Sequence, residues 1–497
     1  MSESATSAIE WQFTRDESGR LTRLVLPGGK ETLFTYECLP DAPQRVKKVT
    51  RSFPGGEVHY EYDERGRRSA LIDQTGSTHF EWDPFGQLTR VRRSRGGEIE
   101  YRYDSLFRLK GYRLGSDFEV EYEYDFLGRM EAIKTPVGTV RYEYWTGQGR
   151  TTRILPNGIR SIREYEPDGQ LAVLTHVDPS DHVIAKFSYA YRPDGLIRQI
   201  PEWSPRGERI LSFDYDAVQR FMAVSDSRGK SWQSDYDALG NRTQERSSDG
   251  TAVDYRHDWA GRLMSVNGAV CEHDDSGNLS SVNVGGRLGQ FEFDHENRIC
   301  GAVQGEVRYE HDGDGNLVAR TWRGERTIYI PDPLSDDWRP LMELAPNGRR
   351  RFYLWDDRGL LAIVDDGAGT YFLPDHLGSA RCLADRTGNV FERRDYSAFG
   401  VFEVPSDGSN LVPGFAGLFW DPAASVYLTR TRAYSPELGR FLQIGFPQSV
   451  PTGSQKSLSG YAYCGNDPVN FTDPAGLAPM RAAIAQNLPS RLVPQGA

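Results

Sequence analysis

A short pattern, aromatic–x–aromatic–Asp, recurs along most of this 497-residue chain. Four successive copies end at Asp63, Asp83, Asp104 and Asp125, with spacings of 20 or 21 residues. Further along, the pattern returns at 21-residue spacing, at Asp216, Asp237 and Asp258. A constant period of this length indicates many copies of one small structural unit, which argues against a single ordinary packed domain.

Each copy carries its own turn. Asp125 is followed by Phe126-Leu127-Gly128-Arg129, and Asp in the first position with Gly in the fourth is typical of a type I turn closed by a left-handed glycine. Before the turn, Tyr122 and Tyr124 fall on one face of a strand and the intervening glutamates on the other. We therefore predict a β-hairpin with one aromatic face, repeated roughly a dozen times between residues 11 and 320.

Two architectures can hold so many hairpins. A propeller would need two hairpins per blade, but odd and even copies do not alternate in sequence. A continuous sheet that spirals on itself is simpler, and a closed sheet of more than ~16 strands surrounds a space that side chains cannot fill. The expected fold is all-β, with a spiralling sheet of hairpins that forms a hollow, cocoon-like shell.

Composition and charge limit what the chain does. Seventy acidic and 59 basic residues give a net charge of −11, which disfavours a nucleic-acid surface. The chain has neither an apolar run of ~18 residues nor a recognisable leader, so we expect no membrane span, a flexible start over residues 1–10, and cytoplasmic synthesis with any export independent of a signal peptide. The scattered cysteines indicate neither disulfides nor a zinc site; they are Cys38, Cys271, Cys300, Cys382 and Cys464.

The second half of the chain carries a series of motifs that resembles the Rhs/YD-repeat family. The repeats match that family, and the more specific motifs follow in its order: YFLPDHLGS (371–379), RDYSAFG (394–400), RTRAYSP (430–436), GRFL (439–442), YAYCGNDP (461–468) and DPAGL (473–477). The resemblance implies a YD-repeat shell over residues 11–330, closed by an Rhs core plug over residues 331–477 and followed by a short tail, residues 478–497. Family members enclose a toxic C-terminal segment and serve in insecticidal toxin complexes, type VI secretion and contact-dependent competition.

The resemblance also implies self-cleavage at the Leu477–Ala478 bond. In the family two aspartates cut the chain, assisted by an arginine that corresponds to Arg432. Asp473 matches the second aspartate, but Gly445 stands where the first is expected. Carboxylate-driven peptide hydrolysis needs two carboxyl groups that share a proton, so the sequence favours a shell that does not cleave itself.

Alternatives to this interpretation remain open. Residues 443–466 contain neither Asp nor Glu, which leaves Asp467 as a remote substitute for the missing acid. If no cleavage occurs, Asp473 and Arg432 are predicted to form a buried ion pair in the plug. The 20 residues after Leu477 are too few for a folded toxin, so we expect none, and residues 480–488 are compatible with two helical turns.

Other candidate sites are weaker. His257, His273 and His311 replace aromatic residues of the repeat without the close spacing of a metal site, and Cys464 has no neighbouring His to activate it. We predict no metal and no cofactor. The expected partners are an enclosed polypeptide or a capping partner, with self-association through an open sheet edge. The competing functions are a cell-surface adhesion module and an active aspartic autoprotease.

Overall fold

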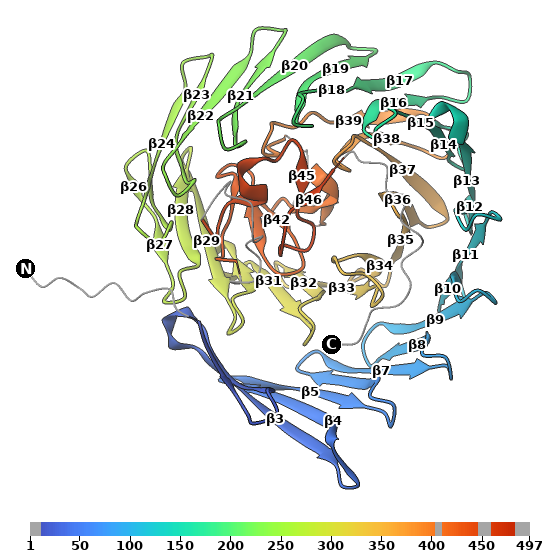
Figure 1. The fold of residues 1–497 in the computed structure, drawn as a ribbon, viewed down its shortest axis with the longest axis vertical. Coiled ribbons are helices and arrows are strands. Elements are labelled where there is room, and N and C mark those ends of the chain that lie inside the picture. Colours follow the sequence, from blue (N-terminus) through green and yellow to red (C-terminus); the bar gives the residue numbers. More distant parts are fainter. Residues whose placement is uncertain (1–10, 403–409, 446–458, 483–497) are drawn as a thin grey trace, which may run out of the picture.

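The computed structural model describes residues 11–402, 410–445 and 459–482. Within these residues the chain forms strands and short 3-10 turns but no α-helix, as predicted. Seen along its shortest axis, the molecule is a ring of strands (Figure 1). Inside the ring lie the C-terminal strands β42 (Val426–Leu428), β45 (Phe471–Thr472) and β46 (Met480–Arg481). The described residues contain no helix that is long and apolar enough to span a membrane.

Two large antiparallel sheets make up the ring. The first has 26 strands, from β1 (Gln12–Arg15) to β26 (Ala269–Val270), and the second has 13, from β27 (Glu272–His273) to β39 (Val390–Arg393). Strands pair almost throughout with their sequence neighbours. A continuous spiral, rather than separate propeller blades, is therefore the architecture.

The repeated Asp–Gly turn explains why these residues form hairpins. Oδ1 of Asp125 accepts the backbone N–H groups of Leu127 and Arg129, both at 2.9 Å, while Oδ2 accepts Nε of Arg129 at 2.7 Å. Gly128 adopts φ +81°, a region that glycine enters without the penalty of a side chain. The Arg129 guanidinium then stacks 4.3 Å from the ring of Tyr144 in the next copy. One repeat thus orients the following one.

The second turn of the spiral packs on the first. Tyr101 donates to Asp332 (2.9 Å), and Nε2 of His176 donates to the carbonyl of Pro374 (2.9 Å). Further contacts of this kind join Tyr142 to Asp356 and Glu202 to Arg381. The partners are 179 to 231 residues apart in sequence, so one turn of the spiral takes about that length of chain. Buried side chains of both turns share one apolar cluster.

The last strands form a small core that docks on the wall. A five-stranded sheet runs from β40 (Val412–Pro413) to β44 (Arg440–Phe441). After this sheet, Tyr461 of the same core donates a hydrogen bond to the carbonyl of Gly277 on the wall, at 2.7 Å. The fold is therefore an all-β spiral shell around a C-terminal core.

The predicted division at residue 330 falls within a strand. β33 spans Glu325–Pro331 and belongs to the sheet that continues to β39. The division at residue 330 is placed by sequence motifs. That it is a domain boundary stays a prediction. At the other end of the wall β1 pairs with β2 (Leu21–Val25), and all four of its residues are exposed.

Candidate cleavage site

The two residues expected at the cleavage site meet in the core. Arg432 directly precedes β43 (Ala433–Ser435), and Asp473 follows β45 (Phe471–Thr472). Nη2 of Arg432 lies 3.3 Å from Oδ2 of Asp473, and both side chains are buried. The backbone N–H of Thr431 donates to the carbonyl of Ala475 at 3.2 Å, which holds the two segments together. The pair is thus a buried ion pair within the core.

Arg432 also binds two backbone carbonyls. Its Nε donates to Gly476 at 2.6 Å and its Nη1 to Gly460 at 3.0 Å. The guanidinium carbon lies 3.5 Å from the centre of the Phe441 ring. Burial lowers the pKa of Arg432 to about 10, against the attraction of Asp473. These contacts hold the guanidinium of Arg432 in place, and it remains cationic near neutral pH.

The Asp473 carboxylate touches the bond that the resemblance marks for cleavage. Its Oδ1 accepts the backbone N–H groups of Leu477 at 2.9 Å and of Ala478 at 3.2 Å. The nitrogen of Ala478 is the leaving nitrogen of the Leu477–Ala478 bond. Burial raises the pKa of the Asp473 carboxyl, although Arg432 and these N–H groups oppose the rise. Asp473 thus lies within hydrogen-bond distance of the leaving nitrogen.

Gly445 lies close to this pair. Its backbone N–H donates to the carbonyl of Gly460 at 2.9 Å, and the same carbonyl accepts Nη1 of Arg432. One shared carbonyl therefore separates the position of the missing aspartate from the arginine. Nearby, Gln443 is buried and its Oε1 accepts the N–H of Ala433 at 2.9 Å. Neither Gly445 nor Gln443 supplies a carboxylate.

Asp467, the proposed substitute, accepts hydrogen bonds from Asn470. It follows the 3-10 turn η6 (Tyr463–Asn466), and its Oδ1 accepts Nδ2 of Asn470 at 2.8 Å. Asn470 in turn donates to the hydroxyl of Tyr215 on the wall, at 2.9 Å. Among the described residues, Asp473 is the one carboxylate that pairs with Arg432.

The segment beyond the bond is held by strand pairing. β46 (Met480–Arg481) pairs antiparallel with β45, and the N–H of Ala482 donates to Asn470 at 2.9 Å. The expected helical turn is therefore wrong at residues 480–481, because the segment completes a two-stranded sheet; residues 483–488 lie outside the described residues. Arg481 also binds the carbonyl of Gly195 on the wall, at 2.5 Å.

The remaining candidates show no activating arrangement. Cys464 is buried, and burial raises the pKa of its thiol well above the usual range, which disfavours the nucleophilic thiolate. Burial lowers the pKa of His257 and His311 to about 3 and that of His273 to about 4. Across the described part of the chain, no three His, Cys, Asp or Glu side chains gather as a metal site would require.

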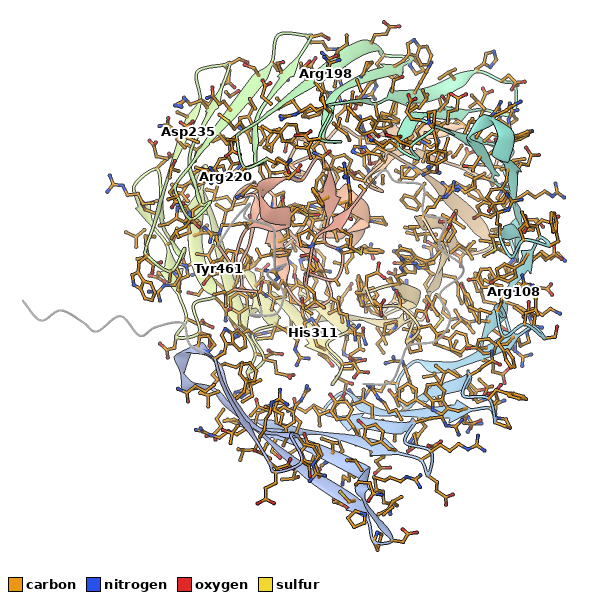
Figure 2. The ribbon with its side chains drawn as sticks, in the orientation of Figure 1. Arg108, Arg198, Arg220, Asp235, His311 and Tyr461 are labelled. Atoms are coloured by element: carbon orange, nitrogen blue, oxygen red, sulfur yellow. The ribbon has the colours of Figure 1, made fainter. Side chains whose placement is uncertain are left out.

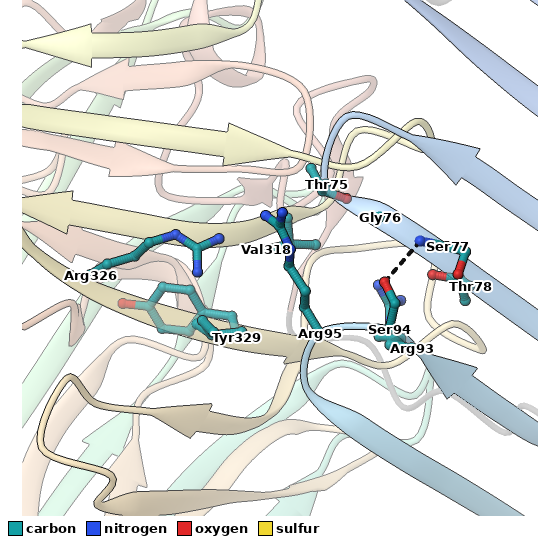
Figure 3. A pocket seen from close by; sticks show the side chains of 11 residues that line it. Thr75, Gly76, Ser77, Thr78, Arg93, Ser94, Arg95, Val318, Arg326 and Tyr329 are labelled. Carbon is teal, nitrogen blue, oxygen red and sulfur yellow. Dashed lines mark hydrogen bonds between the residues drawn. The ribbon is translucent and has the colours of Figure 1, made fainter.

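A shallow pocket lies where the two spiral turns meet, and sequence reasoning did not identify it. It is partly open to solvent and lies between residues 75–78 and 93–95 of the first spiral turn and the strands β32 (Leu317–Trp322) and β33 of the second (Figure 3). Arg326 and Arg93 line it, but Arg326 is paired with Glu310 at 2.7 Å and Arg93 faces Asp312 at 3.5 Å. Ser94 accepts the N–H of Ser77 there, at 2.9 Å. Of these contacts, the Arg93–Asp312 pair joins the two spiral turns, whereas the other two lie within one turn each.

Comparison with known proteins identifies the same kind of fold. A family model described as Teneurin YD-shell matches residues 176–469. Toxin protein Tse5 of Pseudomonas aeruginosa is 28% identical over 466 residues, covering 87% of this chain and 31% of Tse5. The tRNA3(Ser)-specific nuclease WapA of Bacillus spizizenii is 27% identical over 257 residues, 48% of this chain and 11% of that protein.

Solved structures agree with these matches. The crystal structure of TcdB2-TccC3-TEV superposes with a TM-score of 0.75 at 15% identity, covering 94% of this chain and 27% of that one. At this identity the likeness concerns the fold. The chain spans 11% to 31% of the length of the curated relatives named above.

Proposed function

The chain belongs to the Teneurin YD-shell family, and we propose that it encloses a polypeptide, of the toxin class, and does not cleave itself after Leu477. One observation carries the enclosing role: the wall turns through more than one full circuit, so that its later strands dock on its earlier ones. Such a wall surrounds a space rather than presenting one flat face. Relatives named as toxins support the class of cargo.

The absence of cleavage is argued from the site. Asp473 can act on the leaving nitrogen, but hydrolysis also needs a base that activates water at the Leu477 carbonyl, and each of these roles is worth ~10²–10⁴ in rate. Gly445 has no side chain that could act as this base, and Asp467 accepts a hydrogen bond from Asn470. The Asp473–Arg432 pair then serves to fasten residues 473–478 to the core. That residues 478–497 contain no folded toxin stays a prediction.

Denaturing mass spectrometry of the purified chain tests this proposal. Because β46 would hold a cut segment in place, the chain must be denatured before it is weighed. We expect one species at the mass of the uncut polypeptide. A species that ends at Leu477 would contradict the proposal and would show that another group supplies the second role.

Restoring the missing acid gives the converse test. Gly445→Asp places a carboxyl group beside the carbonyl that Arg432 binds, and we expect it to start cleavage after Leu477. Gly445→Ala is the matched control, and adding Asp473→Asn to Gly445→Asp should abolish the cut. Cleavage in the alanine variant would refute the role assigned to the carboxylate.

A further inference from the structure

Three adjacent turns of the wall carry a row of exposed apolar side chains. They join β7 (Gly76–Trp82) to β8 (Leu88–Arg93), β9 (Gly97–Tyr103) to β10 (Leu109–Leu114), and β11 (Phe118–Tyr124) to β12 (Met130–Thr135). Phe126 is 93% exposed and Phe85 76%. We call this set the turn row: Phe85, Leu106, Phe107, Phe126 and Leu127.

The turn row is one surface rather than scattered side chains. The rings of Phe85 and Phe107 lie 5.3 Å apart, and Gln87 donates to the carbonyl of Phe107 at 3.1 Å, so the first two turns touch. The Arg108 guanidinium of the second turn lies 4.4 Å from the ring centre of Tyr124, directly before the third turn. Arg108, directly after the middle turn, lies at the outer rim of the ring, whereas His311 lies toward its centre (Figure 2). At ~200 Å² for a fully exposed aromatic side chain, the three phenylalanines alone expose roughly 400 Å². Patches of this size on a single chain are often functional.

The same kind of turn is covered elsewhere in the molecule. Asn466 binds the carbonyl of Gly240 at 2.6 Å, Tyr461 binds that of Gly277 at 2.7 Å, and Tyr60 binds that of Gly313 at 2.7 Å. Later turns of the repeat thus dock on other parts of this chain. Surfaces of this chain therefore can bind a turn of this kind. For the turn row, a second copy of the chain can provide such a surface.

Charge does not oppose a like partner. Asp104 pairs with Arg108 and Asp125 with Arg129, each at 2.7 Å, within their own turns. Two such rows can approach each other without a strong repulsion between like charges. An interface between identical surfaces takes twofold symmetry.

We propose that the turn row is a self-association surface, at which two copies of this chain meet row to row about a twofold axis. The phenylalanines of two rows together contribute about 800 Å², and Leu106, Leu127 and the flanking turn residues add to that area. The total approaches the ~1,200 Å² at which stable interfaces begin. The dimer is therefore concentration-dependent, and its apolar centre carries most of its affinity.

Sedimentation equilibrium over a wide range of concentration tests the proposal. The wild-type chain is expected to pass from monomer to dimer. The double variant Phe85→Ser, Phe126→Ser should raise the dissociation constant at least ~30-fold, the effect of losing one strong interface residue. Both side chains are exposed, so the variant should unfold at the same urea concentration as the wild type.

A matched control separates the row from apolar exposure in general. Val270 is 75% exposed and Leu288 54%, away from the row, and Val270→Ser, Leu288→Ser should leave the dissociation constant unchanged. A wild-type chain that stays monomeric throughout, or equal weakening by both double variants, would overturn the proposal, as would a wild-type monomer that binds lipid vesicles through the row. None of these outcomes bears on enclosure or cleavage.

Discussion

Replacing Asp421 by Asn should loosen the core from the wall. Asp421 ends β41 (Phe419–Asp421) and is fully buried. Its Oδ2 accepts Nε of Arg320 at 2.7 Å and the hydroxyl of Tyr309 at 2.6 Å, and its Oδ1 accepts Nη2 of Arg320 at 2.8 Å. Tyr309 and Arg320 belong to β31 (Val307–His311) and β32 (Leu317–Trp322). The carboxylate therefore joins the core to the shell.

The cost follows from the burial of both partners. The side chains of Arg320 and Asp421 are 1% and 0% exposed, and removing one charge from such a pair leaves the other uncompensated, which costs about 3–5 kcal/mol. Tyr309→Phe removes one hydrogen bond to a charged group and should cost about 1.5–3 kcal/mol. Replacing both charges, with Arg320→Met and Asp421→Leu, should cost less than Asp421→Asn, because no charge is then buried alone, although the buried Tyr309 hydroxyl loses its acceptor.

Urea unfolding followed by tryptophan fluorescence measures these differences. Asp366→Asn is the control, because Asp366 pairs with Arg349 at an exposed position and such pairs contribute ~0–1 kcal/mol. If Asp421→Asn lowered the free energy of unfolding by less than about 1 kcal/mol, the pair would not fasten the core. A double replacement as damaging as Asp421→Asn would point to packing rather than charge.

Two further predictions concern single positions. Burial lowers the pKa of His176 to about 3. The unfolded chain, with a His pKa of ~6.5, therefore binds a proton that the native state excludes. The free energy of unfolding should be at its full value above about pH 6.5 and should fall as the pH drops towards 3. His176→Gln should reduce this fall by up to ~1.4 kcal/mol per pH unit in urea titrations, and an unchanged slope would refute the assignment. A Cβ on Gly476, at φ +73°, would lie 2.2 Å from Oγ1 of Thr429, whereas one on Gly66, at φ +78°, would meet nothing within 4 Å. Gly476→Ala should therefore speed amide exchange across residues 471–482, while Gly66→Ala costs only ~1 kcal/mol of backbone strain; equal exchange there in both variants would count against a tightly packed site.

Local structure could be predicted from the sequence because each repeat contains its own turn. Asp125 and Gly128 form the expected turn and bulge. The same turn forms at Asp104 without a glycine, since Phe107 adopts φ +64°. Repetition thus identifies the hairpin even where one copy departs from the pattern.

Contacts between the spiral turns could not be predicted in this way. His176 and Pro374 are 198 residues apart, and nothing in the local pattern of either repeat points to the other. At the candidate site, motifs placed Asp473 and Arg432 together. They could not show that Asp473 binds the N–H of Ala478, or that Gly445 and Arg432 share the carbonyl of Gly460, because those contacts depend on how the core folds back.

Electron cryomicroscopy of the purified chain tests the enclosing shell most directly. The account predicts particles with a curved wall of strands around a space of low density, with the C-terminal core lying inside the wall (Figure 1). Particles filled with uniform density, or extended sheets without a wall that turns back on itself, would contradict it.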